Sequence, residues 1–117
     1  MTQETFFEDV LDEAWVAAEQ AVKAKGPENL HALDCGFAWV VIGGNEPIAR
    51  YCRRKVNERA GNFSGRYGSK GYPKGWQWWG PGAGHVQAIG HKVAGAQAFQ
   101  AVLGRYNIRA DVGSRLD

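Results

Sequence analysis

The sequence predicts a small α/β domain, in which three helices cover a three-stranded, partly parallel sheet. Helical and strand-like patterns alternate along the 117 residues, glycine and proline separate them, and a hydrophobic content of 44% supplies one core. The expected order of elements is α-β-α-β-α-β. Its two strand-helix-strand connections lead us to expect parallel strands joined by right-handed crossovers. At this length we expect residues 1–117 to form a single domain.

The first predicted helix and the first predicted strand have the strongest patterns. Thr5 and Glu8 have the spacing of a capping box, and apolar residues recur at helical intervals after them. The sequence therefore predicts a helix over 5–25, which ends at the stop signal Gly26-Pro27. The apolar, β-prone run 37–42 follows, and its unbroken hydrophobicity favours a central strand that is covered on both faces.

The remaining elements alternate with glycine-rich segments. A second helix begins at Asn45-Glu46-Pro47, with asparagine as its cap and proline in its first turn. Residues 61–75 lack periodicity and are predicted to form a long loop, which is a common place for function. A short strand over 76–79, a third helix that ends near Arg105 and a last strand around 108–112 complete the chain.

Composition restricts the cellular setting. No apolar run reaches the length of a membrane-spanning helix, and the N-terminal segment "MTQETFFEDV" is acidic, unlike a secretory signal. We therefore expect a cytoplasmic protein with no membrane partner. Cys35 and Cys52 are too few for a disulfide framework, and we expect both to be reduced.

Charge is distributed unevenly along the chain. Residues 1–34 carry eight acidic against two basic side chains, whereas residues 50–74 carry eight basic side chains against Glu58 alone. Such a contrast could create a local positive field for an anionic ligand, or it could reflect an acidic helix that packs beside a basic one. The sequence leaves both interpretations open.

The segment 50–85 combines aromatic, basic and glycine residues, which is the composition of a site for a nucleotide or nucleic acid. Aromatic rings stack on bases, cations neutralise phosphates, and glycine-rich backbone presents N–H groups to phosphate oxygens. The candidate ligand-binding residues are Trp76, Trp78, Trp79, Tyr67, Tyr72, Arg66, Lys70, Lys74, Arg53 and His85. The alternative is that the tryptophans are core residues, although alternation along a strand places Trp79 on the face opposite Trp76 and Trp78.

Enzyme chemistry has weaker support. Cys35 and His85 could form the nucleophile and base of a small hydrolase, but Cys35 leads an apolar strand, where a buried inert thiol is the competing interpretation. His85 could contact a ligand or cap the following turn. The chain contains no Walker pattern and no recognised spacing of zinc ligands. We therefore expect a non-enzymatic protein without a metal or cofactor.

Three segments carry a resemblance to a known family. The stretches "CGFAWVVI", "KVAGAQAFQAVL" and "VGSRLD" resemble a family of small uncharacterised proteins carried by bacteriophages and other mobile elements. The resemblance implies a phage-type accessory protein in the bacterial host cell, acting on nucleic acid, a signalling nucleotide or a host protein. It implies no catalytic residues.

Two kinds of protein partner follow from the same features. Tryptophan, tyrosine and arginine are enriched at the energetic centres of interfaces, so the tryptophan-rich strand could instead bind and inhibit a bacterial host protein. The unpaired edges of a small sheet could also accept strands from a second copy, which predicts a possible homodimer.

Overall fold

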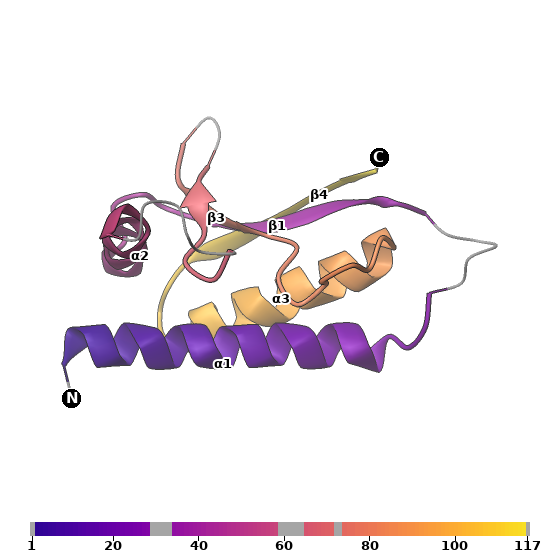
Figure 1. Cartoon of the computed structure of the whole chain (residues 1–117), viewed down its shortest axis with the longest axis horizontal. Helices are drawn as coiled ribbons and strands as arrows, with labels where there is room; N and C mark the ends of the chain where they lie inside the picture. The colour runs from indigo at the N-terminus through magenta and orange to yellow at the C-terminus, as the bar shows by residue number, and fades with distance from the viewer. Residues whose placement is uncertain (1, 29–33, 59–64, 72–73, 117) are drawn as a thin grey trace.

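The computed structural model describes residues 2–28, 34–58, 65–71 and 74–116, which form three helices and four strands (Figure 1). The helices are α1 (Gln3–Ala24), α2 (Pro47–Glu58) and α3 (Ile89–Arg105), and the strands are β1 (Gly36–Ile42), β2 (Ser69–Lys70), β3 (Trp76–Trp79) and β4 (Ala110–Leu116). None of the described helices is long and apolar enough to cross a bilayer.

The sheet differs from the predicted one. Its order is β2-β3-β1-β4, and each neighbouring pair is antiparallel. In the two central pairings Val40 lies opposite Trp78 on one side and Val112 on the other. The prediction of a three-stranded, partly parallel sheet is therefore wrong, in both strand number and strand direction.

The error has a topological cause. Strands β3 and β4 are joined through α3 and run in the same direction, because both are antiparallel to β1, but β1 lies between them. Strands β1 and β2 are likewise joined through α2 and separated by β3. This is the split β-α-β arrangement of ferredoxin-like sheets, here preceded by α1. The predicted connection from 37–42 to 76–79 is wrong in direction, because β2 intervenes and β3 runs antiparallel to β1. The predicted connection from 76–79 to the last strand is wrong in adjacency, because β1 lies between β3 and β4.

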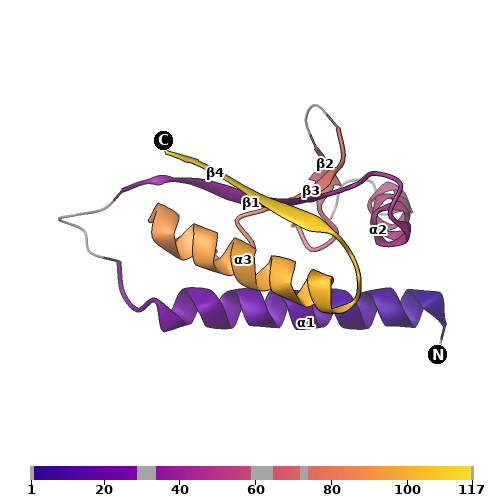
Figure 2. The ribbon, with the colours of Figure 1, turned by 180° about the vertical axis from the view of Figure 1, so that it is seen from behind.

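Helices α1 and α3 lie on the same side of the sheet, with α3 against the strands and α1 packed on α3 (Figures 1 and 2). Side chains of alternate strand residues fill the space between these layers, including Ala38, Val40, Ile42, Trp76 and Trp78. Burial alternates strictly along β1, so the prediction that this strand is covered on both faces is wrong. The sheet thus has an inner face toward the helices and an outer face.

Several boundaries also differ from the predicted ones. The last strand, predicted around 108–112, covers Ala110–Leu116 instead. Helix α1 begins at Gln3, because the Thr2 hydroxyl accepts the Thr5 N–H at 3.1 Å and caps the helix two residues earlier than expected. The predicted loop 61–75 contains β2, which forms a hairpin with β3. Residues 61–64 and 72–73 of this loop lie outside the described residues.

Candidate functional site

The three clustered tryptophans divide between the two faces of the sheet. Trp76 and Trp78 are 4% and 1% exposed, and their indole N–H groups donate to the backbone carbonyls of Tyr67 and Arg66 at 2.6 and 3.0 Å. Trp79 is 48% exposed and lies on the outer face. Of the three predicted stacking residues, Trp79 alone combines an exposed ring with a position on the outer face, because the other two rings are built into the core.

An aromatic cluster surrounds Trp79 on the outer face. The Trp39 and Trp79 ring centroids are 5.0 Å apart, and Phe37 meets Trp79 edge-on at 6.2 Å. The Trp39 indole lies directly over Gly113 of β4, where a Cβ atom would be 2.3 Å from the ring. Glycine at this position lets the indole lie flat on the sheet. We call Phe37, Trp39 and Trp79 the outer-face aromatic cluster.

Two cations flank the Phe37 end of this cluster. The Arg115 guanidinium lies 5.3 Å from the centre of the Phe37 ring, and the Lys92 ammonium lies 5.1 Å from it. Lys92 also donates to the Gly36 carbonyl at 2.7 Å, which fixes the ammonium beside the strand. Positive charge and aromatic surface are therefore adjacent at this end of β1.

A groove of about 850 Å³ adjoins the other end of the cluster. Its floor is the outer face at Trp39, Val41 and Gln77, and the turn 43–47 and Lys74 form its walls. The carboxylates of Glu46 and Asp111 also line it. The groove is therefore lined by apolar, acidic and basic side chains, and the basic one is Lys74 of the β2–β3 hairpin.

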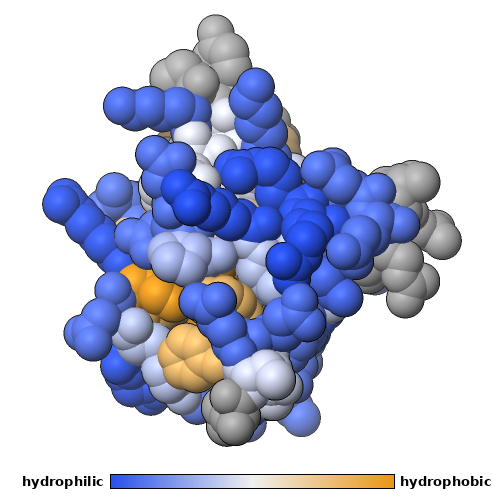
Figure 3. Space-filling view, turned by 90° about the vertical axis from the view of Figure 1, so that its left-hand side faces the viewer, coloured by the Kyte–Doolittle hydropathy of each residue, from blue (hydrophilic) through white to orange (hydrophobic). Residues whose placement is uncertain are grey.

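A second groove of about 680 Å³ lies between α2 and the hairpin, and it brings together four predicted site residues: Trp76, Arg53, Lys70 and Lys74. The described residues that line it include no carboxylate. Arg53 donates to the Gly44 carbonyl at 3.1 Å and lies 5.3 Å from the Trp76 ring centre. Lys74 lines both grooves, and Figure 3 shows that the α2 end of the molecule is covered mainly by hydrophilic side chains.

Arg66 and Tyr67 have a different role from the predicted one. Arg66 forms ion pairs with Glu8 and Asp12 of α1 at 2.6 and 2.8 Å, and the Tyr67 hydroxyl donates to Glu8 at 2.8 Å. The Tyr51 hydroxyl donates to the same carboxylate. These contacts lie on the helical side of the sheet and hold α1, α2 and the segment 65–68 together, away from the outer face.

The electrostatics of this cluster follow from its hydrogen bonds. Burial alone would raise the pKa of Glu8, but the hydrogen bonds from Tyr51, Arg66 and Tyr67 outweigh it and lower this pKa below 4.5. Burial and the hydrogen bond to Glu8 raise the pKa of Tyr51 and of Tyr67. Arg66 and the carboxylate are therefore both charged at neutral pH, and Arg66 is committed to an internal contact.

The remaining predicted residues are dispersed. His85 is exposed in the turn before α3, and the Cys35 thiol donates to the Gln87 side-chain oxygen at 3.8 Å. The described residues contain no group of three side chains suited to a metal ion. Cys52 is fully buried in α2, and burial raises its pKa to about 12. Tyr72 lies outside the described residues.

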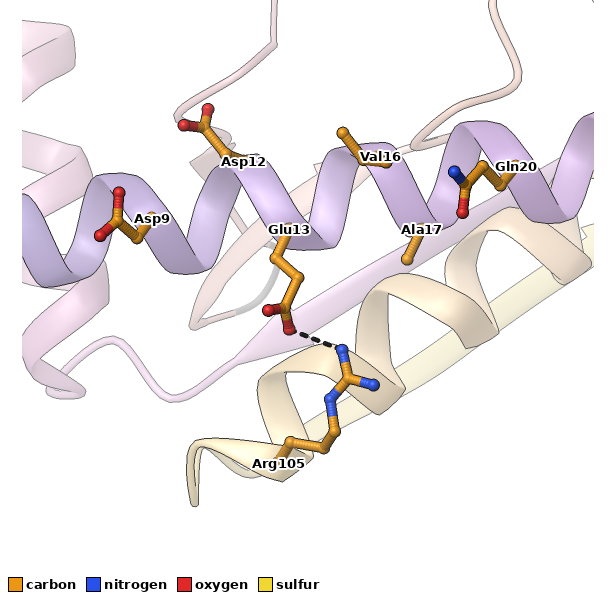
Figure 4. A pocket seen from close by; sticks show the side chains of 7 residues that line it. All are labelled: Asp9, Asp12, Glu13, Val16, Ala17, Gln20 and Arg105. Atoms are coloured by element: carbon orange, nitrogen blue, oxygen red, sulfur yellow. Dashed lines mark hydrogen bonds and ion pairs between the residues drawn. The ribbon is translucent and has the colours of Figure 1, made fainter.

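A third groove, between α1 and α3, is lined mainly by acidic side chains, unlike the groove between α2 and the hairpin (Figure 4). Its volume is about 510 Å³, and Asp9, Asp12 and Glu13 line it together with Arg105. The Glu13–Arg105 ion pair, at 2.6 Å, crosses it. This carboxylate-rich surface is unsuited to phosphate. We take the outer face, with the two grooves that Lys74 lines, as the candidate site, because this region combines an exposed aromatic cluster with cations.

The sequence interpretation missed Phe37, Trp39 and Arg115. An available signal was the alternation of large aromatic residues with smaller ones in β1, which places Phe37 and Trp39 on one face. The continuous hydrophobicity of the run concealed this signal.

Comparisons of the chain with models of protein families, with curated proteins and with solved structures found no match.

Proposed function

We propose that this protein binds single-stranded nucleic acid on the outer face of its sheet, with bases stacked on the outer-face aromatic cluster. The observation that carries this proposal is the half-exposed Trp79 ring, which lies beside Trp39 with cations beyond both ends of the cluster. Stacking on an aromatic side chain contributes about 1–3 kcal/mol per base, whatever the base.

The placement of the rings supports a strand of nucleic acid rather than an isolated base. Phe37 and Trp39 lie on β1 and Trp79 lies on β3, the two central strands of a four-stranded sheet. RNA-recognition motifs also stack two or three bases on aromatic residues of a four-stranded sheet. Arg115 at one end and Lys74 at the other could contact successive phosphates.

The second groove extends the same binding path. Lys74 lines both grooves, so a strand that leaves the outer face at Lys74 would next meet Lys70 and Arg53. The logarithm of the binding constant falls linearly with the logarithm of the salt concentration, and each neutralised phosphate of a single strand makes this slope more negative by about 0.7. Binding by this path would therefore become weaker in steps as these cations are removed.

The test is a fluorescence titration with short single-stranded oligonucleotides at several salt concentrations. We expect quenching in the unchanged protein, and a Kd about 5- to 150-fold higher in Trp79→Ala because one stacking contact is lost. Trp79→Phe should recover part of the affinity. Val16→Ala is the matched control, since Val16 is an equally exposed apolar residue on α1.

Lysine replacement separates phosphate contact from stacking. In Lys74→Ala we expect weaker binding with a shallower salt slope, whereas in Trp79→Ala the slope should stay unchanged. Absence of quenching by every oligonucleotide would refute the proposal. Salt-insensitive capture of a host protein that depends on Trp79 would instead favour the inhibitor hypothesis.

A non-enzymatic, phage-type accessory role in the bacterial cytoplasm agrees with this proposal and stays a prediction from the sequence. A hydrolase that uses Cys35 and His85 is disfavoured by the hydrogen bond from the Cys35 thiol to Gln87. A thiolate nucleophile needs a base within hydrogen-bond reach. Binding without chemical change of the oligonucleotide is therefore the expected result.

A further inference from the structure

Strand β4 forms one edge of the sheet and is the longer of its two edge strands. Its seven residues pair along their whole length with β1, from Ala110 opposite Ile42 to Leu116 opposite Gly36. The other side of β4 therefore presents backbone N–H and C=O groups to a partner strand, although the Ala110 carbonyl already accepts a hydrogen bond from the Gln100 side-chain amide at 2.8 Å. Leu116, near the end of this strand, is 66% exposed.

The two charged residues of β4 are placed symmetrically about its centre. Asp111 and Arg115 lie two residues before and two residues after Gly113, and both are exposed on the outer face. Consider an antiparallel pair of identical strands related by a two-fold axis midway between their two Gly113 residues, which we call an axis at Gly113. Each Asp111 would then lie opposite Arg115 of the other copy. Leu116 would lie opposite Ala110.

Neighbouring registers lack this complementarity. Residues that oppose each other in an antiparallel pair point to the same face of the sheet, so their sequence numbers differ by an even number. A two-fold axis perpendicular to the sheet must therefore pass midway between two copies of one residue. An axis at Val112 would bring Arg115 opposite Arg109, and an axis at Ser114 would bring it opposite Gly113. Opposite charges across a strand pair stabilise it and like charges destabilise it, so Gly113 is the favoured centre.

We propose that β4 pairs antiparallel with β4 of a second copy, centred on Gly113, to form a homodimer with one continuous eight-stranded sheet. The partner is a second copy because the charge pattern of the edge is complementary to itself. A two-fold axis perpendicular to the sheet keeps both outer faces on the same side. The two aromatic clusters would then share one surface, although the dimer does not depend on the ligand proposed above.

Charge reversal tests the pairing directly. We expect the unchanged chain to sediment as a dimer in analytical ultracentrifugation, and Asp111→Arg and Arg115→Asp to sediment as monomers, because each creates two like-charge pairs. Mixing the two single variants should restore a dimer, since every opposing pair is then complementary. The double variant Asp111→Arg/Arg115→Asp should also dimerise, because it exchanges the two charges.

Glu19→Arg is the matched control, since it reverses an exposed charge on α1 and should leave the dimer intact. Circular dichroism of each variant separates loss of pairing from loss of folding. A monomeric unchanged chain, a dimer that survives both single reversals, or monomers in both the mixture and the double variant would each overturn the proposal. The opposite charges of β4 would then serve to prevent edge pairing.

Discussion

Replacing Glu8 by alanine should destabilise the fold more than replacement of any other described carboxylate on α1. The change removes the acceptor of Arg66, Tyr51 and Tyr67. Three hydrogen bonds to a buried charge would be worth about 1.5–3 kcal/mol each, but the Glu8 and Arg66 side chains are 30% and 33% exposed. Discounting for solvent screening leaves a loss of about 2–4 kcal/mol in the free energy of unfolding.

Urea titration and thermal melting followed by circular dichroism measure this loss. For a chain of this size it corresponds to a melting temperature about 8–16 °C lower. Glu13→Ala is the matched control, because Glu13 also lies on α1 and accepts hydrogen bonds from an arginine and a tyrosine, Arg105 and Tyr106, but in an exposed ion pair. Its replacement should have a far smaller effect.

The same carboxylate predicts how stability depends on pH. The folded pKa of Glu8 lies below its ordinary value of 4.5, so folding favours the charged form. The resulting stabilisation is complete above the unfolded pKa and is lost as pH falls through the folded pKa. Acid titration of Glu8→Gln should therefore show a smaller loss of stability below about pH 4.5 than the unchanged protein shows.

Equal destabilisation by Glu8→Ala and Glu13→Ala would refute the reasoning, because partial burial of the Glu8 cluster would then contribute nothing. Arg66→Ala completes the test of its assigned role. We expect this variant to lose stability while its folded fraction keeps the affinity for oligonucleotides. A large loss of affinity instead would return Arg66 to the binding site.

Two further predictions concern the hairpin and the buried thiol. Gly75→Ala should cost about 1–3 kcal/mol in urea unfolding, since Gly75 has φ +96° and an added Cβ would lie 2.7 Å from the Ile42 carbonyl oxygen. Gly65→Ala, at φ +84° with open space around it, should cost less. A thiol reagent should modify Cys35 in the native protein, and Cys52 after denaturation alone, because Cys52 is fully buried with its pKa raised to about 12.

Local patterns predicted most of the elements but not how the strands are arranged. Helical periodicity identified α1 and α3, and the glycine-bounded runs identified β1 and β3, because these signals depend on neighbouring residues. Strand β2 was missed because two exposed residues, Ser69 and Lys70, cannot show alternation. Strand order was missed because the insertion of β1 between β3 and β4 is set by long-range pairing, which sequence spacing does not report.

Local patterns also predicted only part of the candidate site, because several of its contacts join residues that are far apart in the sequence. Alternation placed Trp79 opposite Trp76 and Trp78, and composition selected Arg53, Lys70 and Lys74, which line one groove together. The role of Arg66 could not be predicted, because its partners Glu8 and Asp12 lie more than fifty residues away in the chain. The importance of Trp39 depends on Gly113 of β4, a contact that no local pattern indicates.

The position of β1 in the sheet affects how the protein folds during its own synthesis. This apolar strand is made before either of its partners, β3 and β4, and its pairing cannot be complete before Leu116 has been made. Until then Trp39 and Val40 belong to an unpaired hydrophobic segment, which is prone to aggregate or to recruit a chaperone. Slow translation of the region after Ile42 should therefore lower the yield of native protein.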